Sequence, residues 1–375
     1  MKIRITSILA LLLVLALCVG LSACGQGGKK EEENLSYGFD LIDDFEETEE
    51  LDANPDQDIS RATEPILQNV MTRLDGQPVR SDAYLYRENL SDTYKQAYDL
   101  IRAGLAEGKK EIYLTVPVNK ADIKMVYRSV YYDSPDLFWM DGGYSYAYNN
   151  YGNVTKVVPK YNTLASDIPG NRAAFENALS AALADMWSLG DATKQAKYAH
   201  DYLISTIDYD YNAVLNQTAY SAVVNKKSVC AGYSRAFQYM MQKMDIRCAF
   251  IAGTCVTSQG SGGHAWNIVE LGGEFYAMDV TWDDPIGAAA GKYYYNYFNV
   301  TDSAIAKDHI RGDVSGKLPS AVGTALTFSA AFGGNQYGTD FDAIQGVLPA
   351  GYGEAATVLI GGSQPDNVTD NPYLP

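Results

Sequence analysis

The sequence predicts an α+β fold in which helices pack on an antiparallel sheet. Residues 171–207 carry apolar side chains at helical spacing, in two pieces that part near Gly190. A further helical pattern, AGYSRAFQYMMQKM, comes directly after Cys230. Several consecutive strands after helices favour an antiparallel sheet. The strand-like segments, between residues 248 and 300, are CAFIAGTC, HAWNIVEL, EFYAMDVTW and KYYYNYFNV.

A smaller mixed α/β unit is expected upstream, at residues 81–163. SDTYKQAYDLIRAGLAEG and ADIKMVYRSVYYD have helical spacing, and KEIYLTV reads as a strand between them. DLFWM and YSYAYNNYG read as aromatic strands near a turn at Gly142 and Gly143. An aromatic stripe of this kind could bind a sugar or a peptide, but we expect it to form core.

The N-terminus has the features of an export signal. Lys2 and Arg4 precede an apolar run at 8–19, and LSACG at 21–25 then resembles a bacterial lipobox. We therefore expect a signal peptide at 1–23, cleavage before Cys24, a lipid on Cys24, and an extracytoplasmic protein anchored to the bacterial cell membrane. An ordinary secretory signal and an uncleaved anchor are the alternatives.

Charge is distributed unevenly along the chain. The formal net charge is −17, and residues 31–60 hold thirteen acids and no base. This predicts that residues 24–80 form a solvated acidic spacer. The rest of the chain is mildly acidic and has no basic stripe, so nucleic acid is not an expected partner. Residues 311–375 are rich in Gly and Ala, and no role is predicted for them.

The number and spacing of the cysteines single out the thiol of Cys230. Three cysteines remain after the signal and the lipid site, an odd number for an exported protein. Cys248 and Cys255 lie on one expected strand at an odd separation, so an unbroken strand places them on opposite faces. We interpret both as small buried hydrophobic residues rather than as a disulfide.

Cys230 is placed where a loop becomes a helix. First-turn amides and the helix dipole favour a thiolate at such a position, and we take this cysteine to be partly exposed. A thiolate nucleophile needs a base, and the base needs an orienting group. His264, on a strand shortly afterwards, is the candidate base, although a histidine on a strand is more often a core residue. His200 and His309 are expected to matter far less.

The hairpin around Gly272 and Gly273 supplies the orienting group. A two-residue loop there pairs residues whose numbers sum to 545. His264 and Asp279 then share a sheet face, opposite or diagonal to each other. Asp279 lies inside the expected strand, whereas Asp283 lies too far along and Asp284 points to the other face.

Three motifs in order resemble the core of the transglutaminase-like superfamily. They are VCAGYSRAFQYMMQKMDIRCAFIAGT, GHAWNIVELGGEFYAMDVTWDDP and YFNVTDSAIAKDH, within residues 195–310. The resemblance implies a papain-like core at 164–310 with Cys230 as nucleophile, His264 as base and Asp279 as orienting residue. The lipoprotein signal and the unit at 81–163 are similar to bacterial surface members rather than to the calcium-dependent animal enzymes.

The expected activity is that of a cysteine peptidase, amidase or protein-glutamine acyl transferase acting on a protein or peptide substrate through a thioester. The alternative is a catalytically weak or inactive surface module that binds peptide or glycan. The backbone N–H of Cys230 is one expected oxyanion donor, and Gln217, Tyr220 and Asn225 remain open as the second. No cofactor and no metal site are predicted, because the chain has no Walker-type loop, paired-cysteine site or EF-hand loop.

Overall fold

The computed structural model describes residues 47–56, 71–257, 260–285 and 293–333. The expected signal peptide, the lipid site at Cys24 and residues 334–375 lie outside these ranges. Among the described helices, none combines the length and the apolar character that crossing a membrane would need.

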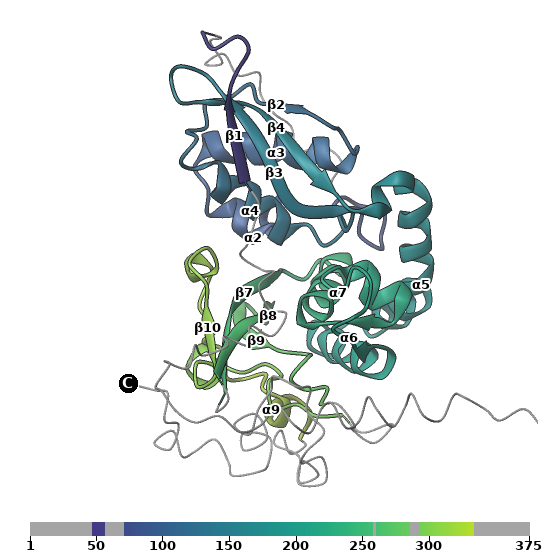
Figure 1. The fold of residues 1–375 in the computed structure, drawn as a ribbon. Helices are drawn as coiled ribbons and strands as arrows, with labels where there is room; N and C mark the ends of the chain where they lie inside the picture. Colours follow the sequence, from purple (N-terminus) through teal and green to yellow (C-terminus); the bar gives the residue numbers. More distant parts are fainter. Residues whose placement is uncertain (1–46, 57–70, 258–259, 286–292, 334–375) are drawn as a thin grey trace, which may run out of the picture. The chain divides into compact units, whose positions relative to one another are not determined.

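The upstream unit is a four-stranded sheet with helices on one face (Figure 1). The strand order is β1-β3-β4-β2, in which β1 runs parallel to β3 and the other pairs are antiparallel. The helices α3 and α4 pack together and contact the sheet. The elements in chain order are β1 (Glu47–Leu51), α2 (Leu85–Glu88), α3 (Asp92–Ala106), β2 (Ile112–Tyr113), α4 (Ile123–Asp133), β3 (Met140–Tyr148) and β4 (Val154–Tyr161).

Most aromatic side chains of this unit form core, as expected from the sequence, although Tyr113 and Tyr151 are exposed. Tyr144 and Tyr146 are buried, and the ring of Tyr144 stacks on that of Tyr127 with centroids 4.2 Å apart. The strand predicted at DLFWM is wrong. Turn hydrogen bonds from the Leu137 N–H to the Ser134 carbonyl and from the Met140 N–H to the Leu137 carbonyl keep residues 136–139 out of the sheet, and only Met140 belongs to a strand, as the first residue of β3.

Part of the expected acidic spacer is a strand. β1 pairs with β3 from Glu47 to Leu51. The acidic side chains find partners there, because Glu49 accepts hydrogen bonds from Tyr146 and Lys120. Residues 47–51 of the expected spacer therefore belong to a sheet, while four of these five residues are exposed, as expected for a solvated segment.

The downstream unit consists of helices on a second antiparallel sheet of order β10-β7-β8-β9 (Figure 1). Gly190 has positive φ between α5 and α6, which confirms the predicted division of that helical segment. The elements in chain order are α5 (Ile168–Ser188), α6 (Ala192–Thr206), β5 (Asp208–Tyr209), β6 (Lys227–Ser228), α7 (Cys230–Lys243), β7 (Cys248–Thr257), β8 (Gly260–Leu271), β9 (Glu274–Met278), α8 (Asp302–Ile305), β10 (His309–Arg311) and α9 (Phe328–Phe332).

Every residue of α7 is buried. One side of α7 packs on β7 and β8, and α6 contacts a different side of the same helix. Its polar side chains bond to backbone at the end of α4: Gln238 donates to the Tyr132 carbonyl at 2.9 Å and Arg235 to the Tyr131 carbonyl at 2.9 Å. The helix that begins at the candidate nucleophile is thus held on several sides.

Two details downstream differ from prediction. The described part of the expected strand KYYYNYFNV forms turns, with one isolated bridge from Val300 to Ala277. Residues 311–333, which had no predicted structure, pack in part against the core. The ring of Phe328 in α9 stacks on that of Tyr295 with centroids 3.7 Å apart. Arg311, the last residue of β10, donates to the Pro319 carbonyl at 3.0 Å, which holds the next segment of the chain against that strand.

Candidate active site

Cys230 is the first residue of α7, and the residues just before it bond to the loop that contains Asn216. The Val229 N–H donates to the Asn216 carbonyl at 3.2 Å, and Ser228 Oγ donates to the same oxygen at 2.5 Å. Gly232 is needed at the crossing, because a Cβ there would collide with Ser228 Oγ and lie 2.9 Å from the Asn216 oxygen. Gly232, two residues after Cys230, therefore allows the start of α7 to lie close against the loop that contains Asn216. Cys230 is only 1% exposed, so the expectation of a partly exposed cysteine is wrong.

The hairpin register is as predicted. Asn267 pairs with Met278 and Leu271 with Glu274, so paired numbers sum to 545. Both turn glycines, Gly272 and Gly273, have positive φ, a conformation that favours glycine. This register brings Asp279 to the end of β9 next to the sheet face that carries the β8 histidine.

Asp279 lies just beyond β9 rather than inside a longer strand, which corrects the predicted strand end. Its Oδ1 accepts the N–H groups of Thr281 at 2.9 Å and Trp282 at 3.1 Å. These bonds turn the chain directly after Met278, as a capping aspartate does at a helix start.

The structure brings His264 and Asp279 together. His264 Nε2 lies 2.6 Å from Asp279 Oδ2, and both residues are fully buried. The other ring nitrogen, Nδ1, has no oxygen or nitrogen partner in the described part of the chain. Burial alone would lower the pKa of His264, but the charges of Asp279 and of a Cys230 thiolate, with hydrogen bonds to both, raise it to about 9. His264 and Asp279 are thus in direct contact, and Cys230 is among the groups whose charge acts on the same imidazole.

The charge on Asp279 depends on the same contacts. Burial would raise its pKa, but the charge and hydrogen bond of His264, together with those of His309, hold the pKa of Asp279 well below its usual range. The carboxylate is therefore ionised at neutral pH.

The other two aspartates of DVTWDDP have different partners. Asp283 Oδ2 lies 3.2 Å from His200 Nε2, and Asp283 also accepts the Tyr297 N–H at 3.0 Å. Asp284 Oδ2 lies 2.8 Å from the Tyr233 hydroxyl. Neither contacts His264, which agrees with the choice of Asp279 made from the register.

Sequence reasoning missed His309. Its Nε2 lies 2.9 Å from Asp279 Oδ2, and its Nδ1 bonds to Asp308. The third motif, YFNVTDSAIAKDH, ends at His309, but its spacing does not reveal the contact with Asp279, because β10 reaches the site by pairing with β7, where His309 lies opposite Cys255. His200 also proves to be an ion-paired core residue, with Asp201 and Asp283 on its two ring nitrogens.

His264, Asp279 and His309 also have the composition of a metal site. One ligand atom from each lies within 4.8 Å of the others. The two nitrogens, however, already bond to one carboxylate oxygen at 2.6 and 2.9 Å. The geometry of the group is that of a hydrogen-bonded charge network.

The three candidates for the second oxyanion donor lie in different surroundings. The Tyr220 hydroxyl bonds to Asn171 at 3.3 Å, and its ring packs against Phe175. Asn225 is exposed. Gln217 comes directly after Asn216, whose carbonyl receives the N–H of the residue preceding the candidate nucleophile. Gln217 is thus the candidate that the backbone places beside the start of α7.

The other two thiols differ from Cys230 in their surroundings. Cys248 and Cys255 are buried and free of disulfides. Burial raises the pKa of Cys248 well above its usual value. Burial, with the charge of Asp279 next, raises the pKa of Cys255 to about 12. This agrees with their interpretation as unreactive packing residues.

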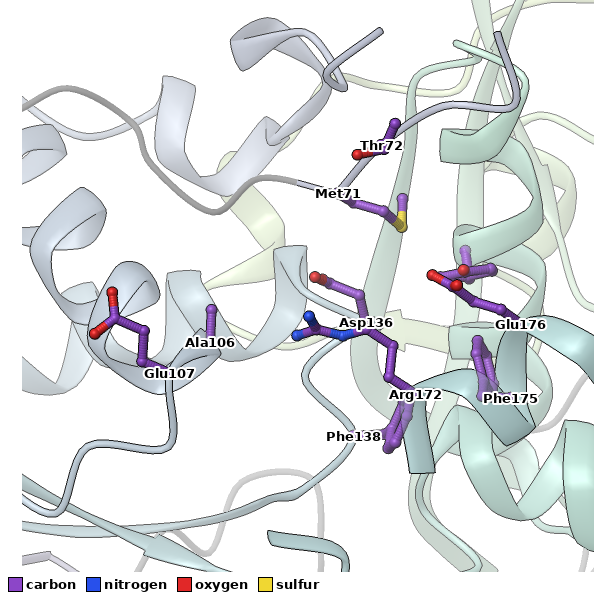
Figure 2. A pocket seen from close by; sticks show the side chains of 10 residues that line it. Met71, Thr72, Ala106, Glu107, Asp136, Phe138, Arg172, Phe175 and Glu176 are labelled. Carbon is purple, nitrogen blue, oxygen red and sulfur yellow. The ribbon is translucent and has the colours of Figure 1, made fainter. Parts of the chain in front are cut away.

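A separate pocket has a volume of about 360 Å³ (Figure 2). Its charged lining residues are Glu107, Asp136, Arg172 and Glu176, and its lining also includes the aromatic residues Phe138, Phe175 and Tyr239. None of the residues that line it belongs to the Cys230, His264 and Asp279 group.

Comparison with known proteins covers part of the chain. Residues 181–280 match the family model described as the transglutaminase-like superfamily. No curated protein sequence matches the chain significantly. A structure from Cytophaga hutchinsonii, titled as a candidate cysteine protease, is 17% identical and covers 23% of this chain and 30% of its own, with a TM-score of 0.22. A structure titled as a TGase is 11% identical and covers 48% of this chain and 51% of its own, with a TM-score of 0.27.

The matched range contains the start of α7 and the whole β8–β9 hairpin. It ends before β10. Residues 181–280 of this chain, with Cys230, His264 and Asp279 among them, are thus similar to the transglutaminase-like superfamily.

Proposed function

We propose that this protein is a cysteine enzyme that forms a thioester on Cys230 from a peptide bond or a glutamine side-chain amide. The single observation that supports the proposal is the buried contact of His264 Nε2 with Asp279 Oδ2 at 2.6 Å, on an imidazole that also feels the charge of Cys230 at the start of α7. Nucleophile, base and orienting group are the parts that covalent acyl transfer requires.

Each residue has a defined step. The Cys230 sulfur attacks the carbonyl carbon, and the C–N bond of the amide breaks as the His264 imidazolium gives its proton to the leaving nitrogen. Water or an amine then attacks the thioester, His264 takes a proton from the attacking group, and the Cys230 sulfur leaves. Asp279 keeps the proton on Nε2 of His264, so that Nδ1 faces the sulfur.

The oxyanion formed in both steps needs donors. N–H groups in the first turn of a helix lack acceptors within the helix, and the N–H of Cys230 is one of them. We assign the second donor to the side-chain amide of Gln217, because the bonds to Asn216 keep that loop next to Cys230.

Turnover of a glutamine peptide tests the proposal. The full chain is incubated with the peptide and a labelled primary amine, and ammonia, peptide cleavage and incorporated amine are measured. Ammonia alone indicates hydrolysis, and incorporated amine indicates transfer. Rates no higher than those of Cys230→Ala would contradict the enzyme proposal. Thiol-probe labelling spread evenly over the three cysteines would then favour the binding module instead.

The location is a separate part of the proposal. We propose that the lipobox-like LSACG leads to a lipid on Cys24 and to a protein tethered outside the cell membrane. Cys24→Ala should then lose palmitate labelling in the membrane fraction. Labelling that survives the change would contradict the assignment of Cys24, and would leave the chemistry at Cys230 untouched.

A further inference from the structure

His309 approaches the candidate site from outside the range that matches the family. It begins β10, which pairs with β7 so that His309 lies opposite Cys255. Its side chain is fully buried. The rings of Trp266 and Trp282 pack against the imidazole at centroid distances of 4.9 and 4.5 Å. Two tryptophans therefore restrict the orientation of this ring.

Both ring nitrogens of His309 meet carboxylates. Nε2 lies 2.9 Å from Asp279 Oδ2, and Nδ1 bonds to Asp308 Oδ1. An ionised carboxylate only accepts hydrogen bonds, so a histidine between two of them must carry a proton on each nitrogen. Burial would lower the pKa of His309, but the charge of Asp308 and the bonds to both carboxylates raise it to about 9. The two carboxylate contacts and this shift both favour an imidazolium at neutral pH.

This imidazolium completes the coordination of Asp279. Oδ1 accepts two backbone N–H groups, from Thr281 and Trp282. Oδ2 accepts His264 at 2.6 Å and His309 at 2.9 Å. A carboxylate has about four acceptor positions, and all are used here. With His309 removed, Oδ2 would keep a single partner.

The charges around His309 alternate in sign. His264, Asp279, His309 and Asp308 form a buried chain of alternating imidazoles and carboxylates, and the Tyr297 hydroxyl donates to Asp308 at 2.8 Å. The titratable groups that face His309 from the neighbouring elements are those of Asp279, Asp308, His264, Tyr297 and Cys255.

We propose that His309 is a positioning residue for the reaction at Cys230: it holds the Asp279 carboxylate ionised and in place behind His264, without touching Cys230 or the substrate. This inference rests on the proposed function for its kinetic consequences. Its structural consequence, an altered environment of His264, does not depend on turnover.

Removing the charge of His309 should change the pKa of His264 in a definite direction. The ring centroids of His264 and His309 are 5.1 Å apart, so each cation disfavours protonation of the other. A neutral side chain at 309 removes that repulsion and leaves Asp279 to act on His264 alone. The pKa of His264 should then rise by about one unit, the lower part of the range for a charge at this distance.

The test uses His309→Gln, which keeps a donor for Asp279 but removes the charge. We expect kcat/KM to fall about 10- to 100-fold, the loss seen for outer partners of metal-bound histidines. The alkaline limb of the pH profile, which reports His264, should move upward. A merely structural histidine would not move that limb.

His200→Gln is the matched control. His200 is also buried between two carboxylates, Asp201 at 3.0 Å and Asp283 at 3.2 Å, and its pKa is likewise raised to about 9, against the lowering effect of burial. It has no bond to Asp279. This variant should lose a comparable amount of stability without a shift of the alkaline limb.

Nitrogen NMR of the imidazole rings gives a readout that needs no substrate. The chain has three histidines, so the two single variants assign all three rings. In the wild-type protein at pH 7, His309 should carry both ring protons. A neutral His309 would overturn the proposal, even if His309→Gln failed to fold.

The two proposals fail separately. If the wild-type protein shows no turnover, the enzyme proposal is contradicted. If the pKa of His264 nevertheless rises in His309→Gln and not in His200→Gln, the positioning role is supported. An active wild-type protein whose His309→Gln variant keeps its kcat/KM within about threefold and its alkaline limb unshifted refutes the positioning role alone.

Discussion

His264 and Asp279 meet at 2.6 Å across the β8–β9 hairpin although they are not directly opposite each other in its register. The register places Asn267 opposite Met278, so Asp279 falls one step beyond the last pair, diagonal to His264. The carboxylate reaches the imidazole because backbone bonds from Thr281 and Trp282 hold Asp279 at the turn. A turn of two glycines thus determines which aspartate the histidine meets.

Substitutions of the three aspartates of DVTWDDP should therefore have different effects on activity. Asp279→Asn should lower kcat/KM by about 10²- to 10⁴-fold, because an amide cannot hold the same imidazole tautomer. Asp283→Asn and Asp284→Asn should lower it less than about tenfold, and act through stability, since Asp283 serves His200 and Asp284 serves Tyr233. Steady-state kinetics of the three variants decide the matter. A crippled Asp283→Asn beside a mildly affected Asp279→Asn would contradict the assignment.

Cys230→Ala and His264→Gln should each abolish turnover, and the double variant should be no worse than either single one. Members of one catalytic unit are not additive. Because Cys230 is 1% exposed, its removal should also lower the free energy of unfolding by about 1 kcal/mol. Denaturant unfolding measures this. Retained activity with a large loss of stability would identify Cys230 as a structural residue.

Local sequence patterns were sufficient for part of this site. The start of α7 at Cys230 and the odd-sum hairpin register can be read from helical spacing and from a two-residue turn, both of which depend on neighbours in the chain. The position of Gln217 depends on a hydrogen-bonded loop, so the sequence alone could not distinguish it from Tyr220 and Asn225 as the second oxyanion donor.

Long-range contacts explain what sequence reasoning missed. His309 reaches Asp279 through the pairing of β10 with β7. β1 lies in an acid-rich segment, and its glutamates are accommodated only because Lys120 and Tyr146 lie beside them in the folded sheet. The family model also ends at residue 280, before His309. Charge composition and spacing along the chain carry no information on these partners.

Gly232→Ala should disrupt the site although alanine is the better helix former. A methyl group there meets Ser228 Oγ and lies 2.9 Å from the Asn216 oxygen, so the loop before Cys230 must move. We expect a loss of kcat/KM of at least about tenfold, since displacements near 1 Å at a site can cost about 10²-fold. Gly316→Ala is the control, because nothing lies within 4 Å of a methyl group there. Equal activity of the two variants would show that this close approach does not position Cys230.

The stability of the protein should fall as pH rises from about 6.5 to about 9. His200, His264 and His309 each have a folded-state pKa raised to about 9, because the charges and hydrogen bonds of their carboxylate partners outweigh the effect of burial. A raised histidine pKa means that the folded protein keeps a proton that the unfolded chain has released. Its contribution is complete below about 6.5 and is lost as pH passes through about 9.

Each such proton adds a slope of about 1.4 kcal/mol per pH unit within that window. Denaturant unfolding at several pH values measures the slope. His200→Gln removes one proton of the three, so it should reduce the slope by about that amount while leaving Cys230, His264 and Asp279 in place. Stability that stayed constant or rose across this window would show that the histidines are not held as imidazolium ions. The charge network around Asp279 would then have to be described with neutral rings.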